Sequence, residues 1–170
     1  LIGIEPSAVL SFVDEYPRMV QPSLKSAADH IAAHTMLIDG FIANEIKAGN
    51  ITPAQFTTEE QSILLHGHCH QKALTNVEDT IWMLSLPQHY NVEPIPSGCC
   101  GMAGSFGYEK EHYAVSQQIG ELVLFPKVRQ ADSATIIAAT GTSCRHQIAD
   151  GTDKKALHPV EILYRALLSK

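Results

Sequence analysis

Two adjacent cysteines, Cys99 and Cys100, lie in a run of small residues, SGCCGMAGSFG, that extends from Ser97 to Gly107. A disulfide between them would be strained, because neighbouring Cα atoms are about 3.8 Å apart across a trans peptide whereas ordinary disulfides need about 4.4–6.8 Å. Two unrelated thiols of the core are another interpretation, since free cysteine is often a small buried residue. The glycines of the run favour a bound group instead, because glycine lets the backbone approach a ligand closely.

The other two cysteines also follow short apolar runs of the chain. Cys69 comes after SILLHG, the adjacent pair comes after YNVEPI, and Cys144 comes after SATIIAAT. If these runs are parallel strands, their carboxyl ends share one edge of a sheet, where ligands bind. The sequence therefore predicts that all the thiols of the chain converge on one metal or cluster site: Cys69, Cys99, Cys100 and Cys144.

The residues leave the kind of centre open, with iron–sulfur favoured over zinc. Structural zinc usually takes cysteine pairs such as C-x2-C, whereas adjacent cysteines project in different directions and better suit two metal atoms of a polynuclear cluster. The histidines of HGHCHQ keep a zinc-stabilised interaction domain open, with Cys69, Cys99, Cys144 and a histidine as ligands. A third interpretation is thiol–disulfide chemistry at Cys99 and Cys100, activated as thiolates near a helix N-terminus.

The elements that must position these cysteines alternate between strands and helices. The expected strands are residues 1–6, 62–67, 90–95 and 133–140, and the expected helices are residues 8–16, 26–50, a stretch bearing Leu74, Val77, Ile81 and Leu84, 110–124, a turn or two after Pro126, one beginning at 144, and 158–170. His158 is expected to cap the last helix, with Pro159 at its first position. Such alternation predicts an α/β, layered Rossmann-like domain with a mostly parallel sheet of about four strands flanked by helices.

Composition narrows the class of protein. The chain has 170 residues, of which 45% are hydrophobic, so it is expected to fold as a single globular domain. A formal charge of −6 disfavours a nucleic-acid partner, and no apolar run approaches the roughly 20 residues that cross a bilayer. Four cysteines are too few for a disulfide scaffold and fit the reducing cytoplasm. The opening LIGIEPSAVL has neither Met nor a signal peptide, and is expected to belong to a fragment of a longer polypeptide.

Four segments together resemble a known family: HGHCHQKAL, SGCCGMAGSFGYEKEHYAVSQQIGE, GTSCRHQI and HPVEIL. They are similar to the cysteine-rich CCG domain of the iron–sulfur subunit of glycolate oxidase, anaerobic glycerol-3-phosphate dehydrogenase, heterodisulfide reductase and the C-terminal part of FAD-linked D-2-hydroxy-acid dehydrogenases. The resemblance implies cluster ligation by Cys69, Cys99, Cys100 and Cys144. Gly141 replaces the first cysteine of the family's C-x-x-C, which leaves four thiols, enough for a conventional 4Fe–4S cluster.

The resemblance also implies a function. Residues 1–170 would be a single CCG domain, the C-terminal fragment of an oxidoreductase, and an electron-transfer module without catalytic residues of its own. FAD, in a missing domain or a partner, would oxidise a 2-hydroxy acid such as glycolate or D-lactate. Electrons would pass to a carrier such as a quinone, and the cytoplasmic protein would reach a membrane only through its partners.

Overall fold

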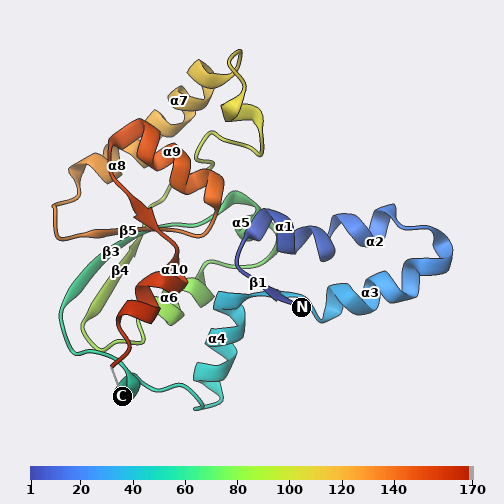
Figure 1. Cartoon of the computed structure of the whole chain (residues 1–170), viewed down its shortest axis with the longest axis horizontal. Helices are drawn as coiled ribbons and strands as arrows, with labels where there is room; N and C mark the ends of the chain where they lie inside the picture. The colour runs from blue at the N-terminus through green and yellow to red at the C-terminus, as the bar shows by residue number, and fades with distance from the viewer. Residues whose placement is uncertain (169–170) are drawn as a thin grey trace.

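The computed structural model describes residues 1–168 and shows a four-stranded, all-parallel sheet flanked by helices (Figure 1). The strands lie in the order β4-β3-β5-β6. Their bounds are β3 Gln61–His66, β4 Tyr90–Pro94, β5 Ile136–Ala139 and β6 Ala156–Leu157. The predicted Rossmann-like α/β class is confirmed.

Helices connect and cover these strands, and several of the connections include short 3-10 turns. The α-helices are α1 Pro6–Val9, α2 Glu15–Met19, α3 Lys25–Ala33, α4 Ile38–Lys47, α5 Cys69–Leu74, α6 Glu78–Leu84, α7 Tyr113–Leu122, α8 Leu124–Gln130, α9 Thr142–Thr152 and α10 Pro159–Arg165. The 3-10 turns are η1 Leu10–Phe12, η2 Pro22–Leu24, η3 Pro53–Gln55 and η4 Phe106–Tyr108. None of the helices within residues 1–168 has both the length and the apolar composition that a membrane crossing requires.

Two hydrophobic layers hold the helices on opposite faces of the sheet. Successive side chains of a strand point to opposite faces, so Ile63 and Leu65 of β3 pack with α6 and α10. Leu64, between them, packs on the other face, where α8 and α9 contribute Phe125 and Ile148. Figure 1 shows α7, α8 and α9 on one side of the sheet and α6 and α10 on the other. This two-sided burial explains why the central strands β3 and β5 contain the apolar runs ILL and IIAA.

The order in which successive strands are added to the sheet reverses at β3. From β3 the chain moves outward to β4, and it then crosses back to place β5 on the other side of β3. The carboxyl ends of β3 and β5 are therefore a topological switch point, the place where open α/β sheets bind ligands. Cys69 and Cys144 follow these two strands.

The first 47 residues differ from the predicted arrangement. The expected strand 1–6 gives only β1 (Ile2–Gly3), which pairs with β2 (Met36–Leu37) in a separate two-stranded sheet. The expected helix 26–50 is broken, because its residues 36 and 37 form β2 between α3 and α4. The fourth strand of the main sheet is instead the short β6, which was not among the expected strands.

Two other predicted helices have different bounds in the structure. The stretch from Leu74 to Leu84 is divided into α5 and α6, because the chain turns between residues 75 and 77. The expected helix 158–170 ends at Arg165, and Leu167 pairs with Phe56 as an isolated antiparallel bridge. Residues 169 and 170 of that expected helix lie outside the described residues.

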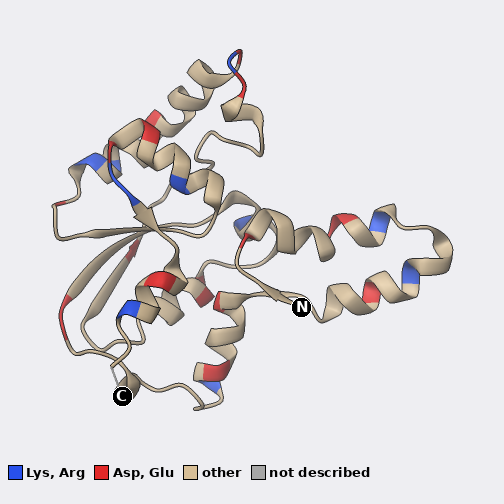
Figure 2. Ribbon diagram, in the orientation of Figure 1, with Lys and Arg blue, Asp and Glu red and all other residues tan. Residues whose placement is uncertain are grey.

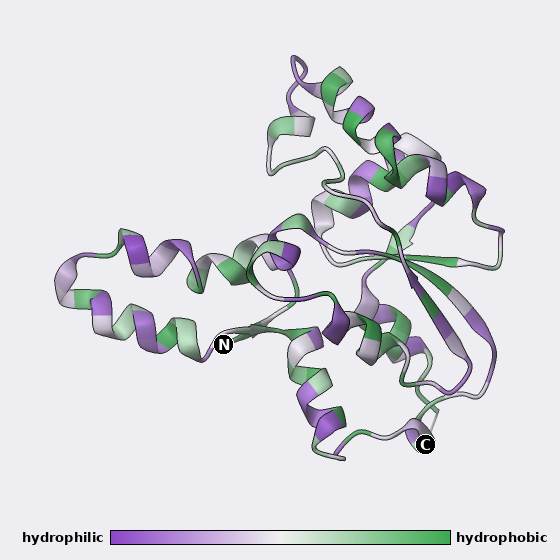
Figure 3. Ribbon diagram, turned by 180° about the vertical axis from the view of Figure 1, so that it is seen from behind, coloured by the Kyte–Doolittle hydropathy of each residue, from purple (hydrophilic) through white to green (hydrophobic). Residues whose placement is uncertain are grey.

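Helices α2 and α3 form an arm that projects from the body of the molecule (Figure 1). Acidic and basic residues both occur along it (Figure 2), including the ion pairs Arg18–Asp14 and Lys25–Asp29. Hydrophobic residues are interspersed with them (Figure 3), and Met19 is 80% exposed. The arm therefore contributes little to the core that positions the cysteines.

Candidate metal centre

The four cysteines lie in three segments that follow the carboxyl ends of neighbouring strands. Cys69 is the first residue of α5, three positions after the end of β3, and Cys144 lies in the first turn of α9, after β5. Cys99 and Cys100 lie in the loop that follows β4. Because β4, β3 and β5 are parallel neighbours, these segments emerge at the same edge of the sheet.

The four sulfurs form one continuous group of contacts. The Cys69 thiol interacts with the sulfur of Cys99, and this interaction together with burial raises the pKa of Cys69. Interaction with Cys100 and then with Cys69 lowers the pKa of Cys99. Interaction with Cys144 and then with Cys99 raises the pKa of Cys100. The structure thus brings together all four residues that the sequence singled out.

The surroundings of Cys144 favour its thiolate form. A hydrogen bond from the Cys100 thiol holds the pKa of Cys144 well below its usual range, against the opposing effect of burial, and His66 acts in the same direction. Cys144 also lies in the first turn of an eleven-residue helix, where the helix dipole favours negative charge. The contacts within the group thus lower the pKa of Cys99 and Cys144 and raise the pKa of Cys69 and Cys100.

Burial of the cysteines increases from one end of the group to the other. Cys69 is exposed and Cys99 is half-buried, whereas Cys100 and Cys144 are 3% and 1% exposed. One end of the group can thus be reached from solvent, and the other lies in the hydrophobic layer that includes Ile148.

His66 joins the buried end of this group. The residue is fully buried at the end of β3, and its Nδ1 atom lies 2.8 Å from the hydroxyl of Ser97. One ring nitrogen of His66 and the sulfurs of Cys100 and Cys144 all lie within 4.8 Å of one another. Its Nε2 atom has no hydrogen-bond partner among residues 1–168.

The other two histidines of HGHCHQ have structural roles. His68 caps α5, because its Nδ1 atom accepts a hydrogen bond of 3.1 Å from the backbone N–H of His70. His70 faces Glu15, with 3.7 Å between Nε2 and the carboxylate. His158 likewise caps α10, as predicted, by accepting a hydrogen bond of 3.1 Å from Val160.

The backbone around the cysteine pair is shaped by Gly101. This residue has φ +105°, a conformation that other residues rarely adopt, and a Cβ atom there would overlap the backbone carbonyl of Ser116. Its N–H group donates a hydrogen bond of 3.3 Å to the sulfur of Cys99. The glycine thus permits a backbone donor to approach a sulfur, as the glycine-rich run predicts.

Lys72 fixes the start of the cysteine loop from α5. Its ammonium group donates hydrogen bonds to the carbonyls of Ser97 and Gly98, at 2.5 and 3.1 Å. Burial lowers the pKa of Lys72, and the nearby cysteine sulfurs oppose that shift. The lysine therefore places positive charge beside the cysteine sulfurs, a role that its position three residues after Cys69 could have indicated.

A buried polar network connects α5 to β5 beneath the cysteines. The side-chain amide of Gln71 donates to Asp39 at 2.9 Å and to Thr80 at 2.9 Å, and its oxygen accepts from Thr140 at 3.2 Å. Thr80 also donates to Asp39. The network fixes the loops of Cys69 and Cys144 relative to each other. Nothing in the sequence pattern distinguishes Asp39, which lies 30 positions before the first cysteine.

The donor set fits a thiolate-bound metal or cluster. Four sulfurs suffice for a 4Fe–4S cluster, and sulfur together with imidazole nitrogen suits zinc. The Nε2 atom of His66 is buried beside the sulfurs without a hydrogen-bond partner among the described residues. Because buried polar atoms are normally paired, this is a second indication that the side chains surround a bound group.

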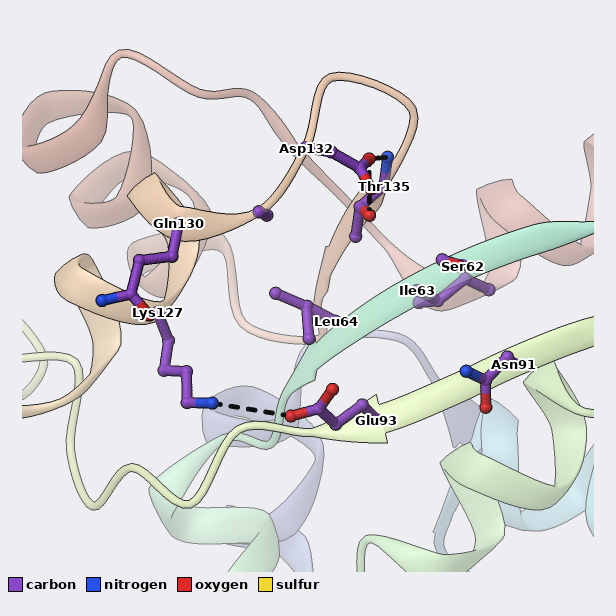
Figure 4. A pocket seen from close by; sticks show the side chains of 10 residues that line it. Ser62, Ile63, Leu64, Asn91, Glu93, Lys127, Gln130, Asp132 and Thr135 are labelled. Atoms are coloured by element: carbon purple, nitrogen blue, oxygen red, sulfur yellow. Dashed lines mark hydrogen bonds and ion pairs between the residues drawn. The ribbon is translucent and has the colours of Figure 1, made fainter.

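A separate hollow of about 340 Å³ lies over β3 and β4 and beside the segment that joins α8 to β5 (Figure 4). Within it Lys127 lies 3.7 Å from Glu93, and Asp132 accepts hydrogen bonds from Thr135. The residues that line the hollow include neither cysteine nor histidine, so the hollow lacks the thiols and imidazoles of the cysteine edge.

Comparison with known proteins points to dehydrogenases. The chain is 26% identical over 167 residues to one subunit of the anaerobic glycerol-3-phosphate dehydrogenase of Escherichia coli, covering 98% of this chain and 40% of that protein. It is 28% identical over 170 residues to D-2-hydroxyglutarate dehydrogenase of Haemophilus influenzae, and 26% identical over 164 residues to that of Pseudomonas putida. These alignments cover 98% and 96% of this chain but only 16% and 15% of the relatives.

No protein-family model matches the chain, and no solved structure matches it. The CCG resemblance therefore has its support in the dehydrogenase relatives alone. The chain corresponds to a minor part of each of them, so it is similar to one portion of larger dehydrogenases.

Proposed function

We propose that this chain is the iron–sulfur electron-transfer module of a flavin-linked dehydrogenase that oxidises a 2-hydroxy acid. The observation that carries the proposal is the convergence of four thiols from three loops at the switch point of the sheet. The dehydrogenase relatives support the reaction class, since the names of two of them specify a 2-hydroxy acid, D-2-hydroxyglutarate. Glycolate and D-lactate are substrates of the same chemistry.

In this proposal Cys69, Cys99, Cys100 and Cys144 hold the cluster, and residues 1–170 form a single cysteine-rich domain. A bound cluster would supply one-electron transfer. The backbone N–H of Gly101 and the ammonium of Lys72 supply positive potential near the sulfurs, which stabilises the negative charge of the centre.

In this proposal FAD in another domain or subunit would remove the hydride from the substrate, as the resemblance to flavin-linked dehydrogenases implies. Cys69 is the exposed member of the group, so its side of the molecule is where electrons would enter or leave. A carrier such as a quinone would receive them, with the chain in the cytoplasm and at a membrane only through partners.

The test is metal analysis of anaerobically reconstituted wild-type protein and of Cys100→Ser. The wild type should contain iron and acid-labile sulfide and absorb in the visible range. The Cys100→Ser variant should lose most of its iron, sulfide and visible absorption, because a hydroxyl replaces a soft thiolate poorly. Ser105→Ala, on the exposed side of the same loop, should retain the wild-type content. Equal iron and sulfide in wild type and Cys100→Ser would remove Cys100 from the ligand set.

A zinc site is the second candidate, and one observation favours it. The ligand atoms of His66, Cys100 and Cys144 lie within 4.8 Å of one another. Ligands of a tetrahedral zinc, with Zn–S near 2.3 Å, are separated by about 3.8 Å. A colourless protein that contains zinc and no sulfide would favour this structural role over electron transfer.

A further inference from the structure

His66 is a buried histidine with one nitrogen occupied and one free. Its Nδ1 atom lies 2.8 Å from the Ser97 hydroxyl, and both side chains are shielded from solvent. Its Nε2 atom has no partner among the described residues. An unpaired polar atom in a protein interior is destabilising, so the free nitrogen of this fully buried histidine indicates a partner that belongs to the functional centre.

The neighbours of the ring identify that partner as sulfur. A ring nitrogen of His66 and the sulfurs of Cys100 and Cys144 lie within 4.8 Å of one another, and Ser97 already holds Nδ1. Nε2 is therefore the nitrogen available to these sulfurs. Of the two, Cys144 is the one whose charged form interacts with His66.

The charge of a metal-bound sulfur selects the tautomer of the ring. A thiolate that ligates metal is anionic and repels the lone pair of an unprotonated Nε2, whereas it attracts an N–H group. With the proton on Nε2, Nδ1 accepts the hydrogen bond that the rotatable Ser97 hydroxyl donates. Ser97 thus acts as a positioning residue that holds the Nε2–H tautomer toward the sulfur.

We propose that His66 donates an Nε2–H hydrogen bond to the Cys144 sulfur of the loaded centre and raises its reduction potential. This inference rests on the proposed iron–sulfur function. One-electron reduction adds a negative charge to the centre, and hydrogen bonds to its sulfurs stabilise the reduced state more than the oxidised state. The bond also gives the orphaned nitrogen its partner.

The test is the reduction potential of the reconstituted centre, followed by its electron paramagnetic resonance signal during a redox titration. His66→Leu removes the donor, and His66→Gln keeps an amide donor of similar reach. Ser97→Ala leaves the ring in place and removes only the group that fixes its tautomer. His70→Gln is the matched control, because that histidine faces Glu15 instead of the buried sulfurs.

The expected result is a more negative potential in His66→Leu, a smaller shift in the same direction in Ser97→Ala, and recovery toward the wild-type value in His66→Gln. The His70→Gln potential should match the wild type. If His66→Leu does not bind a centre, the reduction potential of Ser97→Ala becomes the deciding measurement. An unchanged potential in Ser97→Ala then overturns the proposal.

Three further outcomes also overturn it. An intact centre with unchanged potential in His66→Leu refutes the hydrogen bond while leaving the iron–sulfur function in place. A strong nitrogen coupling in pulsed paramagnetic resonance would show that His66 ligates metal directly. A wild-type protein without iron or sulfide refutes the proposed function itself, and the donor role with it.

Discussion

The carboxylate of Glu5 accepts a hydrogen bond of 2.7 Å from the backbone N–H of Thr142, at the start of the helix that carries Cys144. These residues are 137 positions apart, so the first few residues of the chain cap the helix at the cysteine edge. Burial acts to raise the pKa of Glu5, but hydrogen bonds from Thr142 and Ser7 outweigh it and the pKa is lowered. The carboxylate is therefore held in its charged form, which suits a helix N-terminus.

Glu5→Ala should destabilise the protein by about 1 kcal/mol, the usual effect of removing a capping side chain. Glu5→Gln keeps an acceptor oxygen, so its free energy of unfolding should fall clearly less than that of Glu5→Ala. The measurement is chemical denaturation of the metal-free protein. Equal stability of wild type and Glu5→Ala would show that the contact leaves the helix start unaffected.

Gly101→Ala should destabilise the cysteine loop by roughly 1–3 kcal/mol through its positive φ alone, with a further loss from overlap with the Ser116 carbonyl. Gly98→Ala is the matched control, since a Cβ atom there meets nothing within 4 Å. Thermal denaturation should separate the two variants. Equal melting temperatures of both variants and the wild type would show that the loop does not depend on the backbone conformation of Gly101.

His158 should make stability fall in mild acid. Its Nδ1 accepts from Val160 and its Nε2–H donates to the carbonyl of Ile4 at 3.0 Å, so the neutral ring is bonded on both sides. Burial lowers the pKa of His158 in the folded state, so the unfolded chain, with a pKa of about 6.5, binds the proton more readily. Stability is therefore lost as the pH falls below about 6.5, and the loss is complete below the folded-state pKa.

The variant His158→Asn separates this effect from other acid effects, because asparagine keeps an N-cap acceptor without titrating in this range. Between pH 7.5 and pH 5 the wild type should lose more stability than the variant. Parallel stability curves for the two proteins would contradict the assignment.

Oxidation of the metal-free protein should link Cys69 to Cys99 and Cys100 to Cys144. The thiols of both pairs interact. Cys99 and Cys100 interact as well, but a disulfide between these neighbours would be strained. Diamide, which accepts two electrons and two protons per disulfide formed, is a suitable oxidant.

Trypsin places Cys69 in peptide 48–72, Cys99 and Cys100 together in 73–110, and Cys144 in 130–145, so mass spectrometry can distinguish cross-linked peptides from a closed loop within 73–110. Cross-linked peptides are expected. A closed loop within 73–110, without cross-links, would instead favour the thiol–disulfide interpretation of the adjacent pair.

The sequence could predict the elements on which the centre depends. Strands β3 and β5 are largely apolar runs buried by helices, and a cysteine follows each of β3, β4 and β5, so the parallel topology predicts that Cys69 lies near Cys144. The short β6 could not be predicted, because two residues carry no periodic pattern. The break of the expected helix 26–50 is equally a tertiary effect, since its apolar spacing continues through β2 and only pairing with β1 opens it.

The residues that support the centre could also not be predicted from the sequence pattern. Asp39 and Gln71 meet only because α4 and α5 are brought together in the folded chain. His66 was visible at the end of a buried strand, but its free nitrogen and the contact with Ser97 depend on the loop after β4. Side chains that cooperate across 30 or more positions are specified by the fold and not by local spacing.

Native mass spectrometry of the anaerobically reconstituted wild-type chain tests directly whether the four cysteines hold an iron–sulfur cluster. We expect a species that carries about four iron and four sulfide per chain. This species should be lost in Cys69→Ser, Cys99→Ser, Cys100→Ser and Cys144→Ser. A chain that binds one zinc ion and no sulfide under the same conditions would contradict it.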